Sequence, residues 1–308
     1  MRNPKTLWIV VLGVLVLLAV VIMSCQTIKE NIGTLTGGKV STSDVEAVER
    51  TTQAVRKSFA EITDEEEYYI GRAVSALILS QYPVYKNDAL TKYVNRVGNS
   101  VVIHSDRPET YAGYHFLILD TEEVNALAAP GGFIFITKGL LKRCQDEEML
   151  GCILAHEVGH VSAKHGLQSI KKSRLIDAFR IIGSEASKRY APAKLAQLTD
   201  IFEDTLGDIA EKLIERGYDR KYEYEADKLS VKTSARTGYD ANGLMDFLNT
   251  MVDDTSTESD KGWFKTHPSA KDRLGRVQGE ISAIPSMPEK NDTRTKRFLE
   301  AMKSLLTM

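Results

Sequence analysis

The spacing of apolar residues along the chain predicts a mainly helical protein. Several separate segments carry apolar residues at helical spacing, which would give each helix one face directed at a core. Helices are expected around 44–62, Ile70–Ile78, Leu90–Val101, Leu150–Val161, Leu195–Leu213, Tyr222–Arg236, Leu244–Met251, Arg273–Val277 and Phe298–Leu306. Thr63 and Glu66 form a capping-box pattern before the helix at Ile70, and Asp146 is placed to begin the helix at Leu150.

Two short apolar runs favour strands. Tyr114–Asp120 is almost continuously apolar, and Phe133–Ile136 is a second run of the same kind. Between them, Asn125–Gly132 is expected to be a loop, because it ends in Pro-Gly-Gly and two glycines allow tight turning. The predicted fold class is therefore α+β and mainly α, with a small sheet beside the helix that begins at Asp146.

The N-terminus has the pattern of a targeting segment. Arg2 and Lys5 precede Leu7–Met23, a run without charge, and a small residue then precedes Cys25. Residues 1–25 are expected to be a lipoprotein signal that leaves a lipid on Cys25, or else an uncleaved membrane anchor. Either outcome would hold the rest of the protein at a membrane, on its far side.

The remaining chain is expected to divide into three parts: a polar tether at 26–43, a catalytic domain at 44–284, and a linker with a C-terminal helix at 285–308. The whole chain of 308 residues is 43% hydrophobic and 27% charged, which suits a globular protein with a real core. The net charge of −2 does not favour nucleic-acid binding, and the sequence shows no basic stripe interleaved with aromatic residues, so no nucleic-acid partner is expected. Apart from Cys25, the cysteines Cys144 and Cys152 could pair or remain two free thiols.

Candidate chemistry lies in the segment His156-Glu157-Val158-Gly159-His160. Residues four apart share a helix face, so His156 and His160 would direct their imidazoles at one point, as two ligands of one zinc ion require. Glu157 lies about 100° round the helix, where it can act as a general base on water without being a ligand.

A third ligand must come from elsewhere in the chain. The metzincin pattern would need glycine and histidine where Ala163 and Gly166 stand, and His165 is one position out of register. Glu223 is the better candidate, with Asp227 one helical turn away to accept the second N–H of a ligating imidazole. Glu225 competes with Glu223, and spacing favours Glu223 only modestly.

Together these motifs resemble the CAAX-prenyl-protease-like, HtpX-like family of zinc metallopeptidases, within the gluzincins. The resemblance spans roughly Ile62 to Val277. It is carried by His156–His160, by Arg220, Glu223, Ala226 and Asp227 in the family register, by the strand segment Asn125–Thr137, and by Thr266-His267-Pro268 with Arg273. It implies a helical zincin-type fold and one zinc ion, with Glu223 as its third ligand.

The resemblance implies an endopeptidase of the cell envelope that cleaves misfolded or misassembled envelope proteins. A single apolar segment makes the chain most similar to the periplasmic lipoprotein and BepA-like members, which implies a place on the periplasmic side. Gln26 follows Cys25 where inner-membrane lipoproteins often have Asp, so the outer membrane is favoured. His267 or Arg273 would stabilise the oxyanion, or His267 would be a fourth ligand. Substrate is expected to add as a strand along Gly132–Ile136. The alternative function is an envelope assembly factor or chaperone with a closed zinc site.

Overall fold

The computed structural model describes residues 62–168, 207, 210–253, 263–267 and 270–306, all within one unit that runs from Ile62 to the C-terminus. Several sequence expectations therefore lie outside the described residues. They are the signal or anchor at 1–25 with Cys25, the tether at 26–43, the helix at 44–62 except its last residue, most of the helix at 195–213, the loop at 254–262 and Pro268. None of the helices that the structure describes is long and apolar enough to cross a membrane.

Two helices open the described chain, as their sequence patterns predict. Helix α3 spans Asp64–Gln81, and its capping box is formed, since Thr63 and Glu66 each accept a hydrogen bond from the other's backbone. Helix α4 spans Asp88–Ile103, and the side chain of Asn87 caps its N-terminus.

A three-stranded sheet follows, with the strand order β1-β3-β2. Strand β1 (His115–Leu119) pairs parallel to β3 (Phe133–Thr137), and β2 (Ala126–Ala129) pairs antiparallel to β3. The expected loop at Asn125–Gly132 is therefore partly wrong, because its alanine run is the strand β2. Alanine has little intrinsic preference for strands, and here pairing and burial of all four residues decide the conformation.

The central place of β3 also corrects the expected substrate path. Because β1 and β2 occupy both edges of β3, an added strand has no free edge along Gly132–Ile136. The carbonyl groups of Ala126 and Ala128 instead face outward from β2, where they meet side chains from His267 and Tyr218.

The turn between β2 and β3 shows why the sequence has Pro-Gly-Gly there. Gly131 has a φ of +76°, and a Cβ on it would lie 2.8 Å from the Cα of Tyr68 on α3. The amide of Gly131 donates to the buried carboxylate of Glu67 at 3.0 Å. The turn is thus fixed directly against α3, and only glycine fits its backbone.

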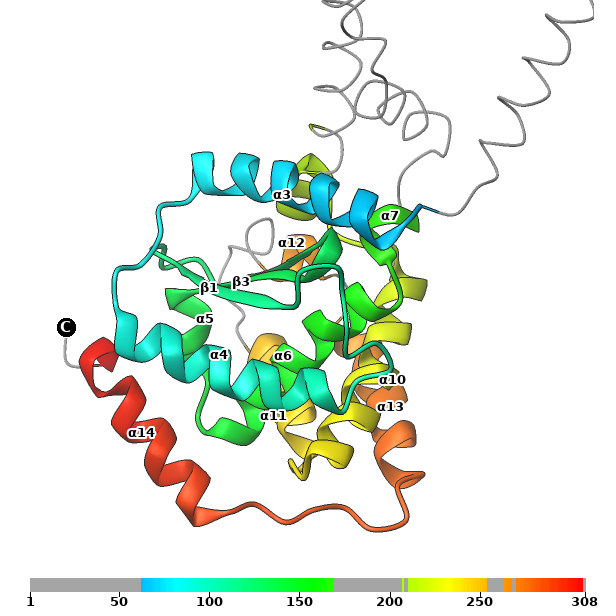
Figure 1. The fold of residues 1–308 in the computed structure, drawn as a ribbon. Coiled ribbons are helices and arrows are strands. Elements are labelled where there is room, and N and C mark those ends of the chain that lie inside the picture. Colours follow the sequence, from blue (N-terminus) through cyan, green and yellow to red (C-terminus); the bar gives the residue numbers. More distant parts are fainter. Residues whose placement is uncertain (1–61, 169–206, 208–209, 254–262, 268–269, 307–308) are drawn as a thin grey trace, which may run out of the picture. The chain divides into compact units, whose positions relative to one another are not determined.

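The sheet lies between α3 and α4 (Figure 1), and it separates two apolar cores. On one face, Leu127, Ala129 and Phe135 pack with the apolar stripe of α3. On the other face, the strand residues that alternate with these in sequence pack with α4 and with the central helix α6 (Glu147–Ser162). Every residue of α6 from Glu147 to Val161 is buried, so this helix lies inside the domain and its polar residues need partners there.

The start of α6 shows how those partners are supplied. Asp146 caps the helix, and Glu147 is wholly buried between Tyr93, Tyr239 and Arg297. Burial opposes ionisation of Glu147, but the ion pair with Arg297 and the hydrogen bond from Tyr93 outweigh it and lower its pKa. The acidic first turn therefore carries paired charges in the interior.

Further helices complete the domain. They are α5 (Lys138–Arg143), α7 (His165–Gln168), a short π-helix (Lys212–Arg216), α10 (Arg220–Thr237), α11 (Asn242–Asp253), α12 (Trp263–Thr266), α13 (Ala270–Ser282) and α14 (Asp292–Leu306). This architecture confirms the predicted α+β, mainly α class. Cys144 and Cys152 are both buried free thiols, which settles the pairing that the sequence left open.

We expect Phe298→Ala to destabilise the whole domain by about 3–5 kcal/mol, because Phe298 fixes α14 in the main core with 1% of its surface exposed. Urea unfolding followed by circular dichroism measures this. Leu299→Ala is the matched control, since Leu299 is 51% exposed and should change stability by about 0.5 kcal/mol or less. Equal effects of the two changes would show that α14 is not part of the folding unit.

Candidate metal centre

The centre is built where α6 and α10 cross. Helix α6 contributes His156, Glu157 and His160, and α10 contributes Glu223 and Asp227. A Cβ on Gly159 would lie 3.2 Å from Leu229 and 3.3 Å from the carbonyl of Ala226, so glycine at this position permits the close contact of the two helices.

Four side chains converge there within reach of one ion. Ligand atoms of His156, His160, Glu223 and His267 all lie within 4.8 Å of one another, and all four residues are buried. The Nε2 atoms of His156 and His160 are 3.0 Å apart. Glu223 places one carboxylate oxygen 3.5 Å from His156 Nε2 and the other 3.4 Å from His160 Nε2. Two imidazoles one turn apart and a carboxylate from a second helix form a donor set that suits zinc.

Glu225, the competing carboxylate, does not join the cluster. It lies two residues further along α10, where its carboxylate meets His165 Nε2 at 3.2 Å. A step of two residues turns a helix by about 200°, which explains why neighbouring glutamates face different surroundings.

Glu157 lies beside the cluster without a hydrogen-bond partner. Its side chain is wholly buried, and neither carboxylate oxygen is hydrogen-bonded within the described part of the chain. Its Oε1 lies 3.7 Å from Nε2 of His267. Burial raises the pKa of Glu157 above its usual value, which makes the carboxylate a stronger base.

Asp227 and Arg273 support the cluster from behind. Asp227 lies 3.1 Å from His156 Nδ1, the position that the sequence predicted for a carboxylate behind a ligand. Arg273 donates to both oxygens of Asp227, at 2.6 and 2.8 Å, and lies 3.0 Å from Glu223. Its guanidinium group is therefore engaged by two carboxylates.

These charges set the ionisation of the acidic groups. Burial opposes ionisation of Glu223, but its electrostatic interactions with His267 and Arg273 outweigh the effect of burial and hold its pKa well below the usual value. Burial likewise opposes ionisation of Asp227, and the charge of Arg273 outweighs it. Both carboxylates are thus anionic, as a metal ligand and its support require.

The two histidines of α6 differ. Burial lowers the pKa of His160 well below its usual value, so its imidazole is neutral. Burial also disfavours charge on His156, but hydrogen bonds to Asp227 and Glu223 raise its pKa to about 9. A metal ion therefore has to displace a proton from His156.

His267 is held in the cluster by α12 and its surroundings. Its ring stacks on Trp263 at 3.9 Å between centroids, and its Nδ1 lies 3.0 Å from Glu223. Helix α12 is attached to the start of β2, because Trp263 N donates to Val124 and Thr266 Oγ1 donates to Asn125. The sequence pointed to His267 but gave no signal for Trp263.

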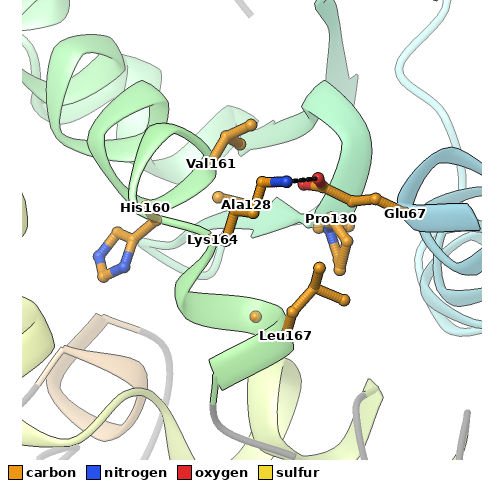
Figure 2. A pocket seen from close by; sticks show the side chains of 9 residues that line it. Glu67, Ala128, Pro130, His160, Val161, Lys164 and Leu167 are labelled. Carbon is orange, nitrogen blue, oxygen red and sulfur yellow. Dashed lines mark ion pairs between the residues drawn. The ribbon is translucent and has the colours of Figure 1, made fainter. Parts of the chain in front are cut away.

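A shallow hollow in the surface adjoins His160 at the end of β2. Figure 2 shows it with Pro130 and Leu167 at its wall and with Lys164 reaching Glu67, 3.4 Å away. Of the four cluster residues, His160 lines this hollow, whereas His156, Glu223 and His267 do not.

Known proteins are similar to the part of the chain that forms the cluster. A sequence model of peptidase family M48 matches residues 88–281, more than half of the chain. A putative beta-barrel assembly-enhancing protease of Vibrio cholerae is 26% identical over 69% of this chain and 43% of its own length. Metalloprotease YcaL of Escherichia coli is 31% identical over 63% of this chain and 69% of its own length. Mitochondrial metalloendopeptidase OMA1 of Schizosaccharomyces pombe is 25% identical over 72% of this chain and 63% of its own length.

The chain thus spans less than half the length of the beta-barrel assembly-enhancing relatives that it matches. The family match nevertheless runs from the start of α4 almost to the end of α13. It includes each element that brings a side chain to the cluster, and the chain therefore belongs to peptidase family M48.

Proposed function

We propose that this protein is a zinc-dependent endopeptidase. The observation that carries the proposal is the convergence of His156, His160 and Glu223 on one point. The carboxylate of Glu157 lies beside them and has no hydrogen-bond partner in the described part of the chain. Catalytic zinc sites use three protein ligands of these types and leave a further position for water or substrate. The donor set, the burial of the ligands and the support of His156 by Asp227 all fit that ion.

The residues divide the chemistry between them. When bound, zinc supplies Lewis acidity, which polarises a carbonyl group and acidifies water. Glu157 takes the proton from the attacking water and delivers it to the leaving amine. Arg273 keeps Asp227 and Glu223 in place, so its role is to position the ligands, and oxyanion stabilisation falls to His267.

The peptide substrate would lie along β2. The outward carbonyls of Ala126 and Ala128 mark that edge as the one beside the cluster, and an extended peptide can pair with such an edge. Tyr218 and His267 contact these two carbonyls in the structure. When a peptide pairs with β2, the two side chains would move away or share the carbonyls with the peptide.

The substrate class and location are part of the same proposal. We infer unfolded or misassembled envelope proteins as substrates, on the periplasmic side of a membrane reached through lipid on Cys25 or the anchor at Leu7–Met23. The apolar N-terminal run supports the membrane attachment. The name of the beta-barrel assembly-enhancing protease relatives supports an envelope substrate.

One observation favours a second function. His267 joins the cluster, and four protein ligands are typical of a closed, structural zinc site. An assembly factor or chaperone would need only such a closed zinc site, which stabilises the fold without catalysis. Cleavage of casein by the purified protein, with and without a chelator, separates the two functions, because only the peptidase degrades casein and stops when zinc is removed.

We expect Glu157→Gln to retain zinc and to lose about 10²–10⁴-fold in cleavage rate, because the change removes the base but none of the proposed ligands. Zinc content by atomic emission and casein hydrolysis measure the two effects. Glu289→Gln at an exposed site is the matched control and should change neither. Full cleavage by Glu157→Gln would reject the mechanism.

Glu223→Gln should weaken zinc binding by about 100-fold or more, at or above the upper end of the ~10–100-fold effect typical of residues behind a ligand. Competition with a chromophoric chelator gives the affinity. Unchanged affinity would remove Glu223 from the ligand set.

His267→Ala distinguishes the two roles of that residue. If His267 is a fourth ligand, zinc affinity falls and cleavage is retained or rises. If it stabilises the oxyanion, zinc affinity is retained and cleavage falls by about 10²–10³-fold. Unchanged values of both would contradict both roles.

A further inference from the structure

His165 is buried behind His160, and the proposed zinc site gives it no task. Its Nδ1 lies 2.9 Å from Nδ1 of His160, and its Nε2 lies 3.2 Å from the carboxylate of Glu225. The side chain of His165 is wholly buried, whereas that of Glu225 is 55% exposed. These contacts form a continuous line of hydrogen-bonding groups from the metal cluster to the surface.

The turn after α6 brings His165 to this place. Lys164 follows α6 with a φ of +54°, a left-handed conformation that reverses the chain, and α7 then begins at His165. The ring of Tyr222 lies 4.6 Å from that of His165, and the ring of Tyr218 stacks on His160 at 4.2 Å. Aromatic packing therefore restricts both imidazoles.

The direction of each hydrogen bond follows from the proposed function. His160 turns its Nε2 into the cluster, 3.4 Å from Glu223, so this nitrogen binds the metal and Nδ1 carries the proton. A neutral imidazole has one donor and one acceptor. Nδ1 of His165 must then accept, its Nε2 must carry the proton, and that proton is donated to Glu225.

We propose that His165 and Glu225 are positioning residues that hold the metal-binding histidine His160 in its orientation and tautomer. This inference rests on the zinc site of the proposed function. The arrangement parallels Asp227 behind His156, with a neutral imidazole interposed in place of a direct carboxylate.

Charge explains why an imidazole suits this position. Glu157, Glu223 and Asp227 are already three buried carboxylates, which Arg273 and a zinc dication would together balance. A fourth carboxylate directly behind His160 would add an uncompensated buried charge. His165 supports His160 without that cost. The carboxylate that in turn supports His165 belongs to Glu225 and lies at the surface, where water solvates it.

The tautomer of His165 tests the inference directly. The zinc-loaded full chain, labelled with ¹⁵N-histidine, contains six histidines to assign by long-range ¹H–¹⁵N correlation. We expect His165 to be neutral with its proton on Nε2, and His160 to carry its proton on Nδ1. A proton on Nδ1 of His165 would overturn the proposal, because two donors would then face each other.

Variants test the effect on the metal. His165→Leu should lower zinc affinity about 10–100-fold, since it leaves the His160 N–H without an acceptor. His165→Asn keeps an acceptor oxygen near that place and should recover most of the loss. His104→Leu, at an exposed histidine, is the control and should bind zinc as the wild type does. Glu225→Ala, at the surface and without risk to the core, should lower affinity severalfold.

Wild-type affinity in both His165→Leu and Glu225→Ala would overturn the proposal, as would an Asn variant no better than the Leu variant. A wild-type chain that binds zinc but cleaves no casein would reject the proposed peptidase activity. The zinc affinities of the variants could still be measured, so the positioning roles of His165 and Glu225 would still be tested. A wild-type chain that binds no zinc would overturn both proposals.

Discussion

Burial of charge is the constraint on which the rest of the site depends. Glu157, Glu223, Asp227 and Arg273 are all at most 2% exposed, and a buried charge is costly unless it is paired. The pairs come from separate elements: α6, α10 and α13 each contribute, and α12 brings His267 to Glu223. The site therefore exists only when these elements are assembled. Among the described residues, Glu157 is the carboxylate of this group that has no hydrogen-bond partner, and it is the residue for which we propose the role of base.

Helix packing satisfies that constraint because small residues lie at the crossing. Gly159 on α6 faces Ala226 on α10, and Ser230 Oγ donates to the carbonyl of Cys152 at 2.7 Å. Larger side chains at these positions would separate the helices and with them the histidines from Glu223. The sheet has a related function, since it keeps the core under α3 apart from the core around α6 and offers the β2 edge to the cluster.

The sequence predicted those features that depend on local periodicity. Helices with a strong apolar stripe, the Thr63 capping box and the His156–His160 pair are all set by spacing within one element. Strand β2 was missed because Ala126–Ala129 lacks a strand signal of its own and is held by pairing with β3. Glu223 and Glu225 could not be separated by spacing alone, since the choice depends on how α10 is rotated against α6. His165, Tyr218 and Trp263 reach the site through tertiary contacts that no short pattern encodes.

Trp263 has a consequence for how the site can be observed. Its indole is 1% exposed, stacks on His267 and meets Phe247 edge-on at 4.8 Å. The chain has two tryptophans, and the other, Trp8, belongs to the apolar run near the N-terminus. Because an imidazole against an indole alters its fluorescence, the emission of Trp263 reports whether His267 is in place. The protein thus contains its own optical probe of the candidate metal centre, which needs no label and no substrate.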